Sequence, residues 1–519
     1  AGLTEVWGQN ITTPALRKLQ IAEFAIANLY VDEIDEEKVV EAGIIKMLSE
    51  LDPHSTYSDA EEVKKMNEPL TGNFDGIGIQ FNMVEDTLFV IQPVSNGPSE
   101  RVGILAGDRI IAVNDTAIAG VQMSSEEIMS RLRGPKDTRV NLRIVRRGVG
   151  EPLLFTVKRD KIPIFSVDAS YMIQPQIGYI RIEHFGATTA DEFRASLIKL
   201  QKNGMKNLIL DLQGNGGGYL NAAIDLADEF LEQKELIVYT EGRASKRSDF
   251  FAKGGGQFRA GRLVILVDEY SASASEIVSG AIQDWDRGII VGRRSFGKGL
   301  VQRPIDLPDG SMIRLTIARY YTPAGRCIQK PYGNTEQYQR DIFNRYNNGE
   351  MINADSVRLP DSLVYKTKKL ERTVYGGGGI MPDYFVPVDT TLYTDYHRNL
   401  RNKGVIIKTA VRYIDNNRDG LLKKYKKFET FNEQFQVNDE NLLTEMKQLA
   451  TKEGIVFNEK EYNISLSLIG IQLKALISRD VWNMNEYYRV INTINPSVVR
   501  AVEILKLGEY EKILKVNVN

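Results

Sequence analysis

The chain has 519 residues, which is too long for one hydrophobic core and suggests about three or four domains. Its 66 basic and 68 acidic side chains give a formal net charge of −2, so the composition offers no electrostatic reason to expect a nucleic acid or an acidic surface as a partner. One cysteine, Cys327, excludes an intrachain disulfide and a cysteine-rich metal site, and no apolar run approaches the roughly 18 residues that cross a bilayer.

Residues 14–50 have the apolar spacing of two amphipathic helices. The second helix should end at residues 52–54, because proline cannot continue a helix, and His54 is interpreted as a turn or packing residue rather than a ligand. We predict a helical region over residues 1–70, in which this pair is a candidate homodimer surface. The residues after Ala1 lack the charged and apolar regions of a signal peptide, so none is expected. The apolar positions are Leu16, Leu19, Ala22, Ile26 and Leu29, then Val39, Ile44 and Leu48.

From residue 72 to about residue 160, short strand-like runs alternate with turn residues, as in a small β-rich domain with two helices. GIGIQF at residues 76–81 resembles the carboxylate-binding loop of a PDZ domain, in which backbone N–H groups capture a chain terminus and the next strand pairs with the ligand. AGDRIIAVN at residues 106–114 matches the turn and strand of the same domain, so we predict a PDZ domain over residues 71–161. Alone, GIGI is equally an ordinary glycine-containing strand. The expected peptide-binding residues are Gly76, Ile77, Gly78 and Ile79.

A glycine-rich turn follows the strand that is predicted at residues 207–212. QGNGGG occupies residues 213–218, and helical periodicity follows over residues 219–231. A glycine-rich turn between a strand and a helix exposes backbone N–H groups at the positive end of the helix dipole. The pattern therefore indicates an oxyanion hole, and the alternative is a tight turn with no ligand.

A small hydroxyl and a lone lysine, Ser273 and Lys298, lie at the edges of apolar runs 25 positions apart. LVILVDE at residues 263–269 predicts a buried strand, after which a helix begins, so Ser273 should face a cleft from a strand-to-helix turn. Lys298 follows a second short strand at residues 288–291 and lies between two glycines, which let the backbone approach the site. A desolvated lysine can take the proton of a serine because burial lowers its pKa. None of the three histidines, His54, His184 and His397, has a nucleophile-like context.

Two further side chains are candidates for holding the lysine. Gln302, which we place one helical turn beyond Lys298, could hydrogen-bond the neutral amine without adding charge. Asp284, eleven positions after Ser273, is the nearest carboxylate that could fix the lysine or its loop, and a solvated helical acid beside Arg287 is the alternative interpretation.

Six segments together resemble the C-terminal processing peptidases, also called tail-specific proteases. They are SASASEI, AIQD, SFGKGLVQ, DLQGNGGG, ARYYTPAGRCIQ and GIMPD. The resemblance implies Ser273 as nucleophile, Lys298 as general base and Gln302 as its orienting partner. Asp284 matches an acid that matters in some members only. The implied oxyanion donors are the backbone amides of Ala274 and of the Gly217-Gly218 turn.

The same resemblance implies a link between the two domains and a cellular location. Arg133 lies where related proteases carry an arginine that couples the PDZ domain to the active site, although Asp137 here replaces the usual glycine. A periplasmic or cell-envelope location follows from the resemblance only.

We therefore predict a multidomain α/β protein. After the helical region and the PDZ domain, a serine-lysine protease core of βα units with crotonase-like architecture should span residues 162–388, and a mainly helical domain residues 389–519. A polar insertion at residues 330–378 interrupts the family pattern. The predicted function is a serine endopeptidase that recognises free C-terminal segments of proteins through the PDZ domain and needs no metal, cofactor or nucleic acid.

The sequence also offers two functions other than a protease, a nucleotide-binding NTPase and a peptide-binding scaffold. GRRSFGK at residues 292–298 has the spacing of a phosphate-binding loop, but Gly299 replaces the Ser or Thr that would bind Mg²⁺, and the acid-bearing strand precedes the loop instead of following it. A catalytically silent PDZ scaffold is disfavoured because Ser273, Lys298 and Gln302 are all present. Residues 415–420 copy half of a calcium loop, but Lys426 stands where its glutamate belongs, so a plain turn is predicted.

Overall fold

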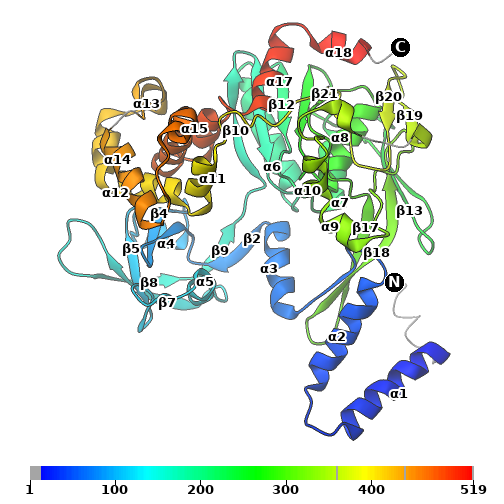
Figure 1. Ribbon diagram of the computed structural model, residues 1–519, viewed down its shortest axis with the longest axis horizontal. Coiled ribbons are helices and arrows are strands. Elements are labelled where there is room, and N and C mark those ends of the chain that lie inside the picture. The colour runs from blue at the N-terminus through cyan, green and yellow to red at the C-terminus, as the bar shows by residue number, and fades with distance from the viewer. Residues whose placement is uncertain (1–12, 358–360, 438–439, 517–519) are drawn as a thin grey trace.

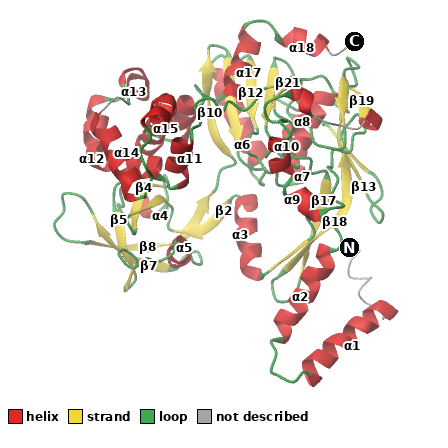
Figure 2. Ribbon diagram, viewed as in Figure 1, coloured by secondary structure: helices red, strands yellow, loops and turns green. Residues whose placement is uncertain are grey.

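The computed structural model describes residues 13–357, 361–437 and 440–516. The chain forms a helical arm, a β-rich unit, a helical unit and a central α/β core. The β-rich unit lies below the helical unit, the core lies beside both, and the arm extends from beneath the core (Figure 1). Sheets form the interior of the core and of the β-rich unit, and helices cover them (Figure 2).

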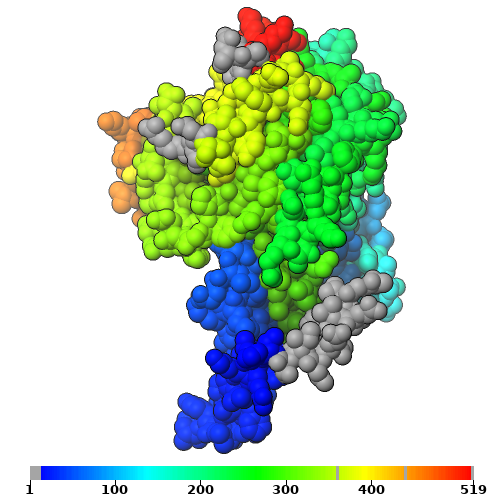
Figure 3. Space-filling model, turned by 90° about the vertical axis from the view of Figure 1, so that its right-hand side faces the viewer, coloured from blue at the N-terminus to red at the C-terminus, as the bar shows by residue number. Residues whose placement is uncertain are grey.

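The N-terminal arm consists of α1 (Pro14–Leu29) and α2 (Glu36–Ser49), which project from the core (Figure 3). The Thr13 and Asp35 side chains cap the two helices by accepting hydrogen bonds from backbone N–H groups. None of the residues of α1 is buried, and Phe24 and Leu29 are 64% and 77% exposed. The apolar face that the sequence predicts is therefore uncovered within the described chain.

The β-rich unit is a sheet in the order β3-β4-β5-β7-β8, with β6 paired to β5 and a separate β2-β9 ribbon. β7 alternates exposed and buried residues, and Val140, Leu142 and Ile144 enter the core of the unit, as expected of a sheet with one solvated face. β3 pairs only with β4, so its other edge is open. The elements are β2 (Asn73–Gly76), β3 (Ile79–Val84), β4 (Thr87–Pro93), α4 (Pro98–Arg101), β5 (Arg109–Val113), β6 (Thr116–Ala117), α5 (Ser125–Leu132), β7 (Arg139–Val145), β8 (Leu153–Lys158) and β9 (Asp160–Pro163).

The central sheet of the core has the order β10-β11-β12-β15-β16-β21, and all of its neighbours are parallel except β10 and β11. Its strands are apolar on both faces, because Leu208 and Leu210 of β12 pack against α6, α7 and α8, while Ile209 packs on the opposite side. The elements are β10 (Val167–Gln174), β11 (Ile177–Ile182), α6 (Thr189–Lys202), β12 (Asn207–Asp211), α7 (Leu220–Asp228), β15 (Leu263–Val267), α8 (Ala274–Asp284), β16 (Ile289–Gly292) and β21 (Tyr384–Phe385).

A second sheet of the core runs in the order β1-β18-β13-β14, with β17 also paired to β18. Its first strand, β1, lies between the arm and α3 in the chain and pairs with β18. The N-terminal segment therefore contributes a strand to the α/β core. The elements are β1 (Thr56–Ser58), α3 (Ala60–Thr71), β13 (Leu236–Glu241), β14 (Ser248–Phe251), β17 (Leu300–Asp306) and β18 (Met312–Tyr321).

The insertion at residues 330–378 packs on the core through buried ion pairs. Arg372 is fully buried and pairs with Asp286 and Asp383 of the core at 2.7 and 2.5 Å. Glu350 of the insertion pairs at 2.7 Å with Arg294, which lies four residues before Lys298. The elements are α9 (Thr335–Gln339), α10 (Asp341–Asn347), the 3₁₀ helices η1 (Ala354–Ser356) and η2 (Asp361–Leu363), and the hairpin β19 (Val364–Lys366) with β20 (Thr373–Tyr375).

The C-terminal region divides into two parts, whereas the sequence predicted one domain over residues 389–519. The helical unit, α11 to α16, has its own aromatic core, but α17 returns to the core and covers the open face of the central sheet through Val498, Ala501 and Leu505. No helix in the described ranges combines the length and apolar character needed to span a bilayer. The elements are α11 (Asp395–Asn402), α12 (Val405–Lys424), α13 (Phe428–Gln434), α14 (Glu440–Lys452), α15 (Glu459–Val481), α16 (Met484–Ile491), α17 (Pro496–Lys506) and α18 (Tyr510–Val516).

The helical unit also contacts the back of the β-rich unit. Arg109 of β5 pairs with Asp415 of α12 at 2.5 Å, and Phe89 and Ile91 of β4 pack against Val411. Val84, at the end of β3, packs against the same cluster.

Candidate active site

The predicted nucleophile Ser273 lies in a strained turn at the start of α8. Its φ and ψ angles are 56° and −110°, a conformation that non-glycine residues rarely adopt. The turn is held because the Ser273 N–H donates to Glu276 Oε2 at 2.8 Å and its carbonyl lies 3.1 Å from the Tyr320 hydroxyl. The fully buried strand β15 ends six residues earlier, so the side chain stands at the carboxyl edge of the parallel sheet.

The glycine-rich loop lies directly against this turn. A Cβ atom on Gly217 would be 2.8 Å from the Ser273 Cβ atom, and one on Gly218 would be 2.0 Å from the Phe185 carbonyl oxygen, so only glycine fits at either position. The Gly217 N–H donates to Asn215 Oδ1 at 2.9 Å. Within the described residues, the N–H groups of Gly218 and Ala274 have no acceptor. Of the predicted oxyanion donors, these two amides are therefore the available ones.

Lys298 and Gln302 are brought together by a turn and a strand. The Lys298 Nζ donates to Gln302 Oε1 at 3.2 Å, and no hydrogen bond joins it to the Ser273 hydroxyl in the described structure. The predicted helical turn between the two residues is wrong, because residues 300–306 form β17 with a bulge between Val301 and Gln302. A bulge re-aims the side chain that follows it, which returns Gln302 to the lysine.

Glu276 connects the serine turn to the lysine turn. Its two carboxylate oxygens accept hydrogen bonds from the N–H groups of Ser273, Gly297 and Lys298 at 2.8, 2.7 and 2.9 Å, and from the Ser295 hydroxyl at 2.5 Å. Burial raises the pKa of Glu276, and these four donors oppose the rise by favouring the carboxylate. One acid therefore sets the distance between the two turns.

The surroundings of Lys298 make its proton easier to lose than it is in water. Burial and then the nearby charge of Arg314 lower the pKa of Lys298 to about 8, against the opposing influence of Glu276 and Asp52. Burial and the charge of Lys298 likewise lower the pKa of His54 to about 4, so this histidine is neutral near pH 7. His54 also accepts, through its carbonyl oxygen, a hydrogen bond from Gln302 Nε2, which leaves Gln302 Oε1 to face the lysine.

Ser273 and Lys298 line one cleft of about 420 Å³. Its walls come from α3, the glycine-rich loop, α8 and the strands β17 and β18, and they are mainly apolar around the two residues. The lining includes Met66, Pro69, Leu70, Gly216, Gly217, Gly218, Tyr219, Leu220, Ala274, Ile277, Leu300, Val301, Gln302, Pro304, Met312, Arg314 and Tyr320.

Asp284 does not belong to this cleft. It lies at the far end of α8, where its carboxylate pairs with Arg326 at 2.5 Å and accepts a hydrogen bond from the Ala324 N–H at 2.7 Å. Both members of the ion pair are fully buried. The structure therefore differs from both sequence interpretations, because Asp284 neither contacts Lys298 nor lies in solvent; it anchors the turn after β18.

The predicted peptide-binding residues lie where β3 begins. Gly78 has a φ of 70°, and a Cβ atom there would be 2.9 Å from Ile162 Cδ1. Ile77 is only 3% exposed and belongs to the core of the β-rich unit, whereas Ile79 opens the free-edged strand β3. The predicted binding residues therefore adjoin the unpaired edge of β3.

Arg133 joins the β-rich unit to a wall of the cleft. Its guanidinium pairs with Glu68 of α3 at 2.5 Å and lies over the Phe74 ring at 4.7 Å. α3 also supplies Met66 and Leu70 to the cleft, so the Arg133–Glu68 pair joins the β-rich unit to the helix that forms this wall.

Three residues that the sequence did not single out are close to the site: Glu276, Tyr320 and Arg314. The spacing Ser-x-x-Glu at residues 273–276 is a capping-box signal that could have revealed Glu276. Tyr320 lies in the segment ARYYTPAGRCIQ, which the resemblance used only as a whole, and no local pattern marks Arg314.

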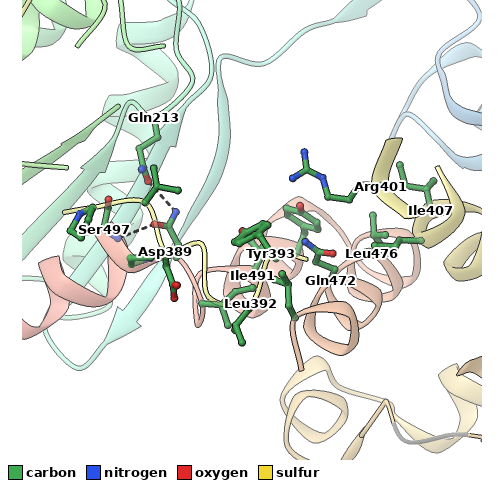
Figure 4. A pocket seen from close by; sticks show the side chains of 18 of the residues that line it. Gln213, Asp389, Leu392, Tyr393, Arg401, Ile407, Gln472, Leu476, Ile491 and Ser497 are labelled. Carbon is green, nitrogen blue, oxygen red and sulfur yellow. Dashed lines mark hydrogen bonds between the residues drawn. The ribbon is translucent and has the colours of Figure 1, made fainter. Parts of the chain in front are cut away.

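A separate cavity of about 570 Å³ lies between the helical unit and the core (Figure 4). Gln213 of the glycine-rich loop reaches it from one side and Arg401 of α11 from the other, but none of the predicted catalytic side chains is among its described lining residues. The described residues also contain no group of three or more His, Cys, Asp or Glu side chains arranged to hold a metal ion.

Comparison with known proteins identifies the family. The pattern of peptidase family S41 matches residues 176–339, that of a PDZ domain residues 76–160, and that of a family of unknown function residues 396–483. The carboxy-terminal-processing protease of Bartonella bacilliformis is 38% identical over 338 residues, which cover 62% of this chain and 76% of that protein. CtpB, a carboxy-terminal processing protease of Bacillus subtilis, is 34% identical over 61% of this chain and 66% of its own length.

Two solved structures are similar in parts of the chain. The photosystem II D1 C-terminal processing protease is 30% identical, with a TM-score of 0.35, and the match covers 59% of this chain and 82% of that one. The PDZ domain of a Vibrio cholerae carboxy-terminal protease, solved with a peptide, is 26% identical with a TM-score of 0.17 and covers 18% of this chain.

The chain belongs to peptidase family S41 and is a serine endopeptidase of the carboxy-terminal processing type, with a PDZ domain. The family and the multidomain α/β fold that the sequence predicted are confirmed.

Proposed function

We propose that this protease captures the free C-terminal segment of a protein with its PDZ domain and cleaves it by a serine-lysine mechanism. One observation carries the proposal: a partly buried lysine, with its pKa lowered to about 8, shares a cleft with a serine in a strained turn. Among the described residues, no carboxylate pairs with the amine, and its hydrogen-bond partner is the uncharged Gln302.

In the proposed reaction, neutral Lys298 takes the proton of the Ser273 hydroxyl as the oxygen attacks the scissile carbonyl carbon. The N–H groups of Gly218 and Ala274 stabilise the oxyanion of the tetrahedral intermediate. Lys298 then gives the proton to the leaving amine, and an acyl-enzyme forms on Ser273. A water molecule, deprotonated by Lys298, hydrolyses this ester and restores the serine.

Gln302 suits the role of an orienting partner. Its amide nitrogen is occupied by the His54 carbonyl, so its oxygen accepts one N–H of the lysine and restrains the direction of the remaining lone pair. A carboxylate in the same place would stabilise the ammonium form and raise the pKa of the base. An amide therefore orients Lys298 with less effect on its charge.

Replacement of either catalytic residue should abolish cleavage. We expect Lys298→Ala to lower kcat/KM by about 10²–10⁴-fold, because a general base is lost, and Ser273→Ala to remove turnover altogether. Cleavage of a tail-bearing protein is followed with and without EDTA, and a folded Lys206→Ala variant, altered at an exposed lysine outside the cleft, serves as the control. Activity that survives either replacement, or that EDTA removes, would contradict the mechanism.

The pH dependence should report the lysine. Since the neutral amine is the active form, kcat/KM is expected to rise about tenfold per pH unit below pH 8 and to level off above it. Initial rates on a peptide without ionisable side chains, between pH 5.5 and 10, measure the midpoint. A profile that is flat across pH 8, or that falls as pH rises through it, would exclude Lys298 as the base.

Terminus capture should depend on a free carboxylate. We expect amidation of a substrate's C-terminus to weaken its binding about tenfold or more, because the backbone N–H groups at residues 76–79 then lose a charged acceptor. Affinity is measured with the Ser273→Ala variant by fluorescence anisotropy. Equal affinities for the free and amidated peptides would count against capture of the terminus.

Arg133→Gln, which breaks the link to α3, should lower kcat on tail-bearing substrates more than Arg139→Gln, a matched change on the exposed face of β7.

The arm is the proposed dimer interface, since the apolar face of α1 has no cover in the described chain. Light scattering after size exclusion should give twice the chain mass for the wild type and the mass of one chain for Leu19→Asp, because Leu19 lies on the apolar face with Leu16 and Ile26. Asn28→Asp adds the same charge to the opposite face of the same helix and should remain dimeric. A wild type that is monomeric at micromolar concentration would refute the interface.

A periplasmic or cell-envelope location is also proposed, and it is supported only by the relationship to bacterial C-terminal processing proteases.

A further inference from the structure

Arg314 is a cation inside the cleft that the reaction scheme does not use. It lies on β18, opposite Pro304 of β17, and lines the same cleft as Ser273 and Lys298. Its charge is felt at the lysine, whose pKa it lowers. The side chain therefore lies near the place where substrate must pass.

The Arg314 guanidinium is partly buried, but it has no carboxylate partner among the described residues. Its Nε atom is buried without any hydrogen-bond acceptor, and its Nη2 atom reaches only the Met66 sulfur, a weak acceptor. No carboxylate of the described residues lies within ion-pair distance of it. Burial correspondingly lowers the pKa of Arg314, with no neighbouring acid to oppose the shift.

Three buried arginines of the core are paired with acids, whereas Arg314 is half-buried and, in the described part of the chain, is not. Arg326 has Asp284, Arg294 has Glu350, and Arg372 has two aspartates, all within 2.8 Å. Withdrawing a charge from water is costly unless it is paired, so an unpaired guanidinium in a cleft is a site prepared for an anion. Its planar fork of N–H donors matches the two oxygens of a carboxylate.

We propose that Arg314 binds a carboxylate of the substrate segment next to the scissile bond and so acts as a specificity-determining residue. The carboxylate is either an Asp or Glu side chain or the terminal carboxylate of a short tail. This inference rests on the proposed serine-lysine endopeptidase. Substrates with an acid at the matching position are cleaved faster, and basic residues there are disfavoured by repulsion from Arg314.

The test uses peptides of one sequence that carry Glu or Gln at each position flanking the cleaved bond in turn, each with a free or an amidated terminus. Wild type should cleave the best carboxylate-bearing peptide about tenfold faster in kcat/KM than its neutral match. Arg314→Gln should remove that preference, and Arg314→Glu should reverse it in favour of Lys. Arg303→Gln, an equal loss of charge on the exposed part of neighbouring β17, should keep it.

A second readout is independent of the peptide's charge. The charged and titratable groups around Lys298 are Arg314, Glu276, Asp52 and His54, and Arg314 is the cation among them that opposes protonation of the amine most strongly. On a neutral peptide, Arg314→Gln should therefore move the pH midpoint of kcat/KM upward, whereas Arg303→Gln should not. A purely structural role for Arg314 would not shift this midpoint.

The outcomes separate this inference from the proposed function. Cleavage of none of the peptides by the wild type would refute the endopeptidase mechanism itself. Cleavage without any preference for a carboxylate, or a preference that survives in Arg314→Gln, would overturn the role of Arg314. Where Arg314→Gln does not fold, Arg314→Lys replaces it, because lysine keeps the charge but not the fork of N–H donors. An unchanged preference for the carboxylate in Arg314→Lys would also overturn the role.

Discussion

The geometry of the cleft depends on the buried carboxylate of Glu276. Four donors converge on it, and two of them are the backbone N–H groups of Ser273 and Lys298. Since those residues lie on opposite sides of α8 and β16 in the chain, few local forces hold their turns together. A carboxylate is suited to this task because it offers two oxygens and several lone pairs, and because charge-assisted hydrogen bonds are about twice as strong as neutral ones.

This arrangement also explains how a serine is kept in a strained turn. The positive φ of Ser273 is unfavourable by itself, but the turn is fixed by Glu276 at its N–H, by Tyr320 at its carbonyl and by the glycine-rich loop against its Cβ atom. Strain of this kind persists only where the surroundings determine the conformation from several sides. The same turn brings the backbone of the glycine-rich loop against Ser273 at the Gly217 position.

Segments far from the catalytic residues in the chain complete the site. The turn at residues 52–55 follows the N-terminal arm and holds Gln302 through the His54 carbonyl, while α3 forms a wall and meets the PDZ domain through Glu68 and Arg133. The helical unit supports the PDZ domain from behind through Asp415. The arm, the PDZ domain and the C-terminal helices are thus each one or two contacts from the cleft or its walls.

The sequence by itself determined the chemistry and the family, because the serine, the lysine and the glycine-rich turn each follow a short buried strand, and such strand-to-turn patterns are local. It also indicated the PDZ domain, whose loop and strand are contiguous. Only the tertiary structure decided which acid belongs to the site. Asp284 and Glu276 lie on the same helix, and the packing of residues 295–298 and 322–326 against its two ends made the first an anchor and the second the link between the turns. Local spacing likewise misplaced Gln302 on a helix and passed over Arg314, because the bulge of β17 and the approach of β18 to α3 arise from contacts between residues that are distant in the chain.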